Sequence, residues 1–77
     1  MTLIIGTEKQ ITEDARDYWT IEAMSKYGGS FVKALAEMAR HADRQNLAKI
    51  KMTWIEYWTE YEKMGHEMEE KHEREEL

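Results

Sequence analysis

Two histidines near the C-terminus, His66 and His72, lie among glutamates at spacings that could hold a metal ion. His66 and Glu70 are four residues apart, and Glu69 and His72 are three apart, so each pair would share one face of a helix. Imidazole and carboxylate groups are ligands that zinc accepts. Glutamate is abundant throughout this segment, however, and a helix end lacks the surrounding groups that fix metal ligands. We therefore interpret these residues as a solvated charged face, and we expect neither a metal nor another cofactor.

The turn Gly28-Gly29-Ser30, with Lys33 one helical turn further on, has the composition of an anion-binding helix N-terminus. It lacks the longer glycine spacing and the Lys-Ser/Thr pair of a phosphate-binding loop, and no strand precedes it. An interhelical turn is the stronger interpretation. The glycines would adopt the left-handed conformation that ends one helix, and Ser30 would cap the next one.

No combination of side chains in the sequence indicates catalysis. The chain contains no cysteine, and its serines are Ser25 and Ser30, of which the second is assigned to capping. His41 lies near Asp43, but no nucleophile adjoins this pair to complete a triad. A small helical domain also offers little of the concave surface that substrates need. We therefore assign no catalytic residue and expect a protein that is not an enzyme.

The composition indicates one small domain. The chain has 77 residues, no cysteine, no proline and a formal net charge of −5. A chain of this length is near the lower limit for burying a sufficient core, so we expect self-association as a homodimer. The longest apolar run, residues 3–5, is too short to cross a membrane, and no signal-peptide pattern is present. A soluble, cytoplasmic protein is expected.

Capping signals predict one helix on each side of the glycine turn. Thr12 followed by two acidic residues is typical of a helix start, because the hydroxyl caps free amides and the helix dipole favours negative charge there. The first helix is predicted over residues 13–26 and the second over residues 31–41. Residues 1–11 contain a β-branched run without a partner strand, so we expect an extended N-terminal arm or a strand that pairs with a second copy, with disorder as the alternative.

Two further helices are predicted after the second one. Asp43 would cap a third helix over residues 44–52. The segment Thr53-Trp54-Ile55-Glu56 fits the capping box S/T-x-x-E, which places a break at Thr53 before a fourth helix; one continuous helix through Thr53 is the alternative. Little apolar surface remains in residues 69–77, so we expect this acidic tail to fray.

These elements define the fold class as all-α, a small four-helix orthogonal or bundle-like domain over residues 12–68. On the first helix, Ile21 and Met24 lie opposite the main apolar face, so we expect that helix to be covered on two sides. The predicted core gathers apolar residues at helical spacing from all four helices. Its members are Trp19, Phe31, Leu35, Met38, Leu47, Ile50, Trp54, Trp58 and Tyr61.

Aromatic residues on the fourth helix predict an interaction surface. Trp54 and Trp58 follow one line of the helix, and Tyr57 and Tyr61 follow the adjoining line. The second and third helices are too short to cover all of this aromatic surface. Because tryptophan and tyrosine dominate binding hot spots, we predict that these four residues bind a protein partner or a second copy. The predicted function is a non-enzymatic protein–protein interaction module.

A basic middle segment supplies the alternative function. Residues 33–51 carry a charge of +3, from five basic and two acidic residues, whereas residues 54–77 carry −6, from nine acidic and three basic residues. A helix, a turn and a second helix with exposed cations are typical of a nucleic-acid-binding regulator. Its phosphate contacts would be Arg40, Arg44, Lys49 and Lys51. The acidic tail would be repelled by the same phosphates, which places this alternative second.

A resemblance rests on four motifs: Tyr27-Gly28-Gly29-Ser30-Phe31-Val32-Lys33-Ala34-Leu35-Ala36, Ala42-Asp43, Asn46-Leu47 and Glu56-Tyr57-Trp58. Over these motifs the chain resembles a group of small uncharacterised proteins encoded by phages and prophages. That group has a proline near the position of Ile55, which this chain lacks. The resemblance implies a viral or mobile-element origin and no activity. By analogy with other small phage proteins, the partner would be a host macromolecule whose function is blocked.

Overall fold

The computed structural model describes the backbone of residues 2–76 and the side chains of residues 13–75. This part of the chain forms four helices, α1 (Thr2–Tyr27), α2 (Ser30–His41), α3 (Arg44–Thr53) and α4 (Ile55–Glu76). No strand occurs in the described backbone, so the all-α fold class is confirmed. The cap predicted at Thr12 and the extended arm predicted over residues 1–11 lie outside the described side chains, and the arm stays a prediction.

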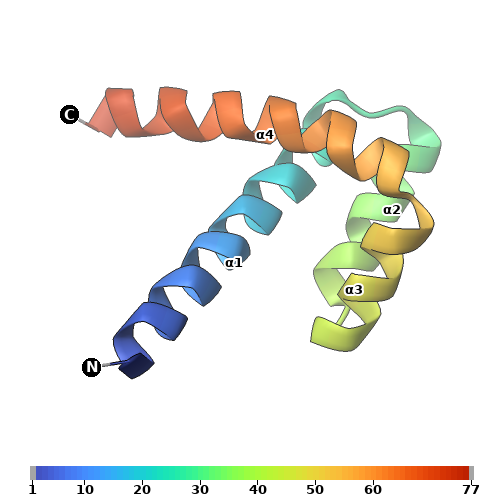
Figure 1. Cartoon of the computed structure of the whole chain (residues 1–77). Helices are drawn as coiled ribbons and strands as arrows, with labels where there is room; N and C mark the ends of the chain where they lie inside the picture. Colours follow the sequence, from blue (N-terminus) through green and yellow to red (C-terminus); the bar gives the residue numbers. More distant parts are fainter. Residues whose placement is uncertain (1, 77) are drawn as a thin grey trace.

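Helix α4 runs along one edge of the molecule, and the other three helices approach it from one side (Figure 1). Helix α1 contacts α4 with its C-terminal part and diverges from it toward the N-terminus, whereas α3 contacts the N-terminal part of α4. The arrangement is open, with extents of 44 × 33 × 19 Å. Its radius of gyration of 13.3 Å exceeds the value of about 11.5 Å expected for a compact chain of this length.

The core lies where α1, α2 and α4 meet. Leu35, Ile50 and Trp58 are buried there, as predicted. Of the other predicted members, Leu47, Trp54 and Tyr61 pack against the core while half-buried, and Trp19 is half-buried as well. The full set of buried apolar residues is Ile21, Ala23, Met24, Val32, Leu35, Ala36, Ala39, Ile50 and Trp58.

The core prediction is wrong for Phe31 and Met38, whose side chains are 54% and 44% exposed. Helix α2 instead buries Val32, Leu35, Ala36 and Ala39, a face turned by about one residue from the predicted stripe. Small side chains on this face allow α1 to approach closely. The spacing of apolar residues along α2 alone does not predict this contact. On α1 the complementary residues are Ile21 and Met24, which fill the core beside α2.

The turn between α1 and α2 is determined by close packing and not by left-handed glycines. No described residue has a positive φ, so the predicted left-handed conformation is wrong. Gly29 is the N-cap of α2, with φ −78° and ψ −171°, and Ser30 is the first helical residue, not the cap. Gly28 has a steric reason to be glycine, because a Cβ there would lie 2.5 Å from the Met24 carbonyl oxygen and 2.5 Å from Val32 Cγ1.

The predicted cap of α3 is confirmed, whereas the predicted break after it is one residue too early. Asp43 Oδ1 accepts a 2.8 Å hydrogen bond from the Asn46 amide. Thr53 is the last residue of α3, and the chain bends at Trp54, where φ is −116° and ψ is 44°. The capping box at Thr53 and the continuous helix are therefore both wrong. Helical hydrogen bonds continue on each side of the bend, from Trp54 N to Ile50 O and from Trp58 N to Trp54 O.

Helices α1 and α4 cross at Gly65. A Cβ on this buried glycine would lie 2.7 Å from both the carbonyl carbon and the oxygen of Trp19 and 2.9 Å from the Thr20 nitrogen. Thr20 is fully buried at the crossing, and its Oγ1 donates a 2.8 Å hydrogen bond to the Arg16 carbonyl. Two helical turns further along α4, the ring of His72 lies 5.3 Å from that of Trp19. The crossing thus sets the position of α4 relative to the α1–α2 turn.

Candidate functional site

The four residues predicted to bind a partner do not share one exposed surface. Trp58 is 2% exposed and belongs to the core, and its Nε1 has no hydrogen-bond partner among the described residues. Tyr57 is 40% exposed, whereas Trp54 and Tyr61 are half-buried against the core. We therefore place Trp58 in the core, which leaves the other three on the candidate surface.

Phe31 joins this surface although the sequence pattern placed it in the core. Its ring lies 5.6 Å from that of Tyr57 and 6.3 Å from that of Trp54. The three residues come from the start of α2, the bend after α3 and the first turn of α4. We call Phe31, Trp54 and Tyr57 the aromatic corner. Val32, the next residue, is also apolar and can fill the core position in place of Phe31. This is the signal in the sequence that Phe31 could be exposed.

A second group of apolar residues continues from the aromatic corner along α4. Tyr57, Tyr61, Met64 and Met68 are spaced by four, three and four residues, which places them on one side of the helix. Tyr27, at the end of α1 and 54% exposed, lines a shallow hollow together with Met64 and Met68. We call these five residues the aromatic–methionine strip. On α4 it spans about 16 Å at the helical rise per residue.

Three of the four residues predicted to contact nucleic acid are engaged in ion pairs with α1. Arg40 lies 3.5 Å from Glu22 and donates a 3.0 Å hydrogen bond to Ser25. Arg44 pairs with Asp14 of α1, and Lys51 pairs with Asp17 of α1. Of the four predicted contacts, only Lys49 forms no ion pair with another described residue. These pairs reduce the positive field of the middle segment. They count against the nucleic-acid interpretation, which stays a prediction.

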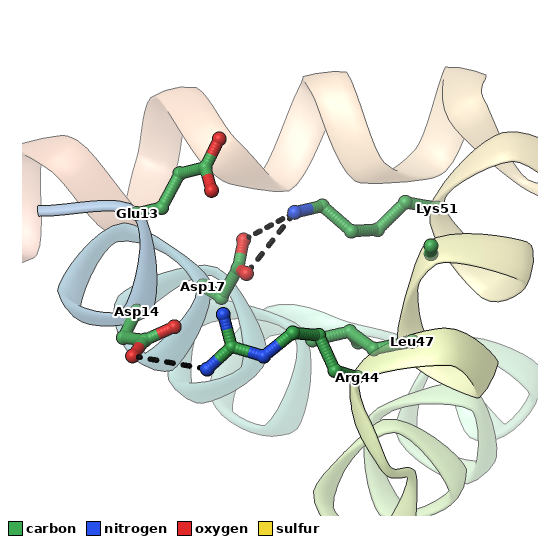
Figure 2. Close-up of a pocket in the computed structure, with 7 residues that line it drawn as sticks. Glu13, Asp14, Asp17, Arg44, Leu47 and Lys51 are labelled. Carbon is green, nitrogen blue, oxygen red and sulfur yellow. Dashed lines mark hydrogen bonds and ion pairs between the residues drawn. The ribbon is translucent and has the colours of Figure 1, made fainter. Parts of the chain in front are cut away.

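A charged groove lies between the middle of α1 and α3. Figure 2 shows carboxylates on the α1 side facing Lys51 and Arg44 on the α3 side. Lys51 Nζ lies 2.9 Å and 3.0 Å from the two carboxylate oxygens of Asp17, whose side chain is 13% exposed. The same ammonium group lies 5.7 Å from the centre of the Trp58 ring. The outer pair, between Arg44 and Asp14, is longer at 3.9 Å and mostly exposed.

This groove links α3 to α1, because α3 contributes only one buried residue, Ile50, to the core. Asp17 contacts Lys51 through both carboxylate oxygens and Asp14 pairs with Arg44, so most of the charges in the groove are paired, whereas Glu13 forms no ion pair among the described residues. The groove affects the candidate site by holding α3 in position beside α1. Since Trp54 directly follows the last residue of α3, the contact between Lys51 and Asp17 helps to fix one side of the aromatic corner.

A double-mutant cycle tests this role. We expect Asp17→Asn and Lys51→Met each to lower the free energy of unfolding by about 1–2 kcal/mol, because each leaves a partly buried charge without its partner. The coupling between them should be about 1 kcal/mol. The matched cycle with Asp14→Asn and Arg44→Met should give less than about 0.5 kcal/mol, since that pair is exposed. Urea unfolding followed by circular dichroism measures both cycles, and equal coupling in the two would contradict the assignment.

Three of the four candidate metal ligands already contact other side chains. His66 Nε2 lies 2.7 Å from Glu70 Oε1 on the exposed side of α4. His72 packs against Trp19. Among the described residues, no group of three or more histidine, aspartate or glutamate side chains is arranged to hold a metal ion.

Comparison of the chain with protein-family models, with curated proteins and with solved structures gives no match. None of the helices, over the residues that the structure describes, combines the length and the apolarity needed to cross a membrane. Three of the seven exposed large apolar residues that the structure describes, Tyr27, Phe31 and Tyr57, lie at the aromatic corner or along the aromatic–methionine strip, where they adjoin the half-buried Trp54, Tyr61, Met64 and Met68.

Proposed function

We propose that this chain is a small, non-enzymatic protein-interaction module that binds a protein partner through the aromatic corner. The observation that carries the proposal is the contact of Phe31, 54% exposed, with Tyr57, 40% exposed, beside the half-buried Trp54. Aromatic side chains lose little conformational entropy on binding and bring a large apolar area. Three such rings held together by separate helices form a preorganised anchor site.

The total exposed surface also supports a partner. The accessible surface is 6005 Å², whereas a compact monomer of 9.2 kDa exposes about 4,900 Å² by the scaling of globular proteins. The difference of about 1,100 Å² is comparable to the roughly 800 Å² that one partner contributes to a stable interface. The excess thus corresponds to about one such interface.

The nature of the partner follows from the charge of α4 and from the sequence resemblance. Exposed Glu56 and Glu60 lie in the first turns of α4, near the corner, so a partner surface with apolar and basic residues is complementary. The resemblance to phage-encoded proteins makes a host macromolecule the proposed target and inhibition the proposed effect. We also propose that the chain is a homodimer.

A matched pair of double variants tests the proposal. Phe31→Ala/Tyr57→Ala removes two rings of the corner, whereas Met52→Ala/Ile55→Ala removes two other exposed apolar side chains, 77% and 55% exposed, beside the bend. Each immobilised protein is exposed to host-cell lysate, and bound proteins are quantified. We expect a partner whose binding falls at least tenfold with the corner variant, as loss of a hot spot would cause. The control variant should retain it.

Two results would contradict the proposal. One is a partner bound equally well by both variants, which would place the binding surface elsewhere. The other is the absence of any specifically retained protein at micromolar concentration. Circular dichroism of each variant shows whether the helical fold is intact, so that a loss of binding is not confused with unfolding.

A further inference from the structure

We propose that the aromatic–methionine strip is the seam of an antiparallel homodimer, in which α4 of one copy packs along α4 of the other. This inference rests on the proposed function only in naming the second partner as another copy of the chain. In this arrangement the second copy packs against Tyr61, Met64 and Met68. Phe31 and Trp54 lie at the ends of the seam and remain available to a different protein.

The spacing of the strip is that of a helix–helix seam. Apolar residues at positions 57, 61, 64 and 68 follow the four-three-four pattern by which one helix interlocks with another. Met64 and Met68 are only half-buried within one chain, and with Tyr27 they line a hollow that a side chain of a facing helix can fill. Methionine adapts its shape to such contacts.

The charges beside the strip identify the occupant. Glu60, Glu67, Lys71 and Arg74 are exposed, and none of them forms an ion pair within the described part of the chain. These four residues change sign along α4, with acids toward its start and bases toward its end, although exposed Glu75 also lies on this side near the end of the helix. Reversing one helix against the other therefore brings opposite charges together, whereas a parallel pair would bring like charges together.

The register follows from pairing Met64 with Met68 of the partner subunit. A two-fold axis between these residues places Glu60 level with the segment from Lys71 to Arg74 of the partner subunit. The symmetry makes this contact twice. Near the axis, Glu67 approaches Glu67 of the partner subunit, and at each end Glu75 comes level with the segment from Glu56 to Glu60 of the partner subunit; both contacts are unfavourable. The seam therefore predicts opposite effects for two glutamates on the same side of one helix.

Sedimentation equilibrium on the full chain and its charge variants tests the seam. We expect the wild-type chain to dimerise and Glu60→Lys to raise the dissociation constant at least tenfold, because two contacts are reversed. Adding Lys71→Glu and Arg74→Glu to Glu60→Lys should restore dimerisation. Glu67→Gln should strengthen it by removing the repulsion at the axis. Glu73→Lys, an equal charge change on the opposite side of α4, should have less than a threefold effect.

A monomeric wild-type chain at millimolar concentration would overturn the inference. So would a dimer that Glu60→Lys and Glu73→Lys weaken equally, or one that the triple exchange fails to restore. The two proposals fail separately. A monomer whose partner binding still depends on Phe31 leaves the proposed function standing, and a dimer that binds no other protein leaves the seam standing.

Discussion

Replacement of Gly65 by alanine is expected to destabilise the protein, although alanine is the better helix former. The added Cβ would overlap backbone atoms of Trp19 and Thr20, at 2.7–2.9 Å, and backbone atoms cannot rotate away as a side chain can. Overpacking of this kind costs about 2–3 kcal/mol, which exceeds the gain of about 1 kcal/mol in helix propensity. The net loss of about 1–2 kcal/mol should lower the thermal midpoint by about 5–15 °C.

Gly29→Ala is the matched control for this experiment. A Cβ at Gly29 would meet no atom within 4 Å, and its φ of −78° is open to any residue. We expect it to change the free energy of unfolding by less than about 1 kcal/mol, because the smaller number of unfolded conformations of alanine offsets its lower preference for an N-cap position. Thermal unfolding followed by circular dichroism measures both. If Gly65→Ala is as stable as Gly29→Ala, α1 and α4 do not cross as closely as described.

Replacement of Trp58 by alanine should have the largest effect of any single change on the fourth helix. The side chain is 2% exposed at the centre of the core, beside the half-buried ion pair of Lys51 and Asp17. Truncation of such a residue costs about 3–5 kcal/mol. The whole stability of a chain of this length is about 4–12 kcal/mol. We therefore expect Trp58→Ala to be largely unfolded in moderate urea.

Tyr57→Ala is the control, because Tyr57 is the neighbouring residue and is 40% exposed. It should change the free energy of unfolding by no more than about 1 kcal/mol. Urea unfolding at 222 nm compares the two without relying on tryptophan fluorescence. A stable Trp58→Ala protein that has lost partner binding would return Trp58 to the interaction surface and would contradict its place in the core.

Local chemistry explains the predictions that hold. The cap at Asp43 depends only on a carboxylate three residues before a free amide, so the sequence alone predicts it. The Gly28-Gly29 turn and the end of α1 near Tyr27 follow from residues within one helical turn. The spacing of the rings on α4 is likewise visible along one helix, but it does not decide which of them are exposed.

The predictions that fail depend on a neighbour that the sequence does not name. Phe31 and Val32 are both apolar and adjacent, and only the close approach of α1 decides that Val32 enters the core while Phe31 remains exposed. In the same way, the positions of α1 and α3 decide that Trp58 is buried while its neighbour Tyr57 remains exposed. The ion pairs of Arg40, Arg44 and Lys51 also join segments far apart in the chain, so the sequence alone does not show that these cations have carboxylate partners.

The sequence by itself determined that this chain is helical, where its second and third helices begin within a residue, and that it carries more aromatic surface than a small core requires. Capping groups and helical periodicity act over a few residues and can be read directly. Only the tertiary structure decided which rings remain exposed, which cations are neutralised and why Gly65 has no side chain. These outcomes depend on the distance between helices, and that distance is set by small residues at the crossing of α1 and α4.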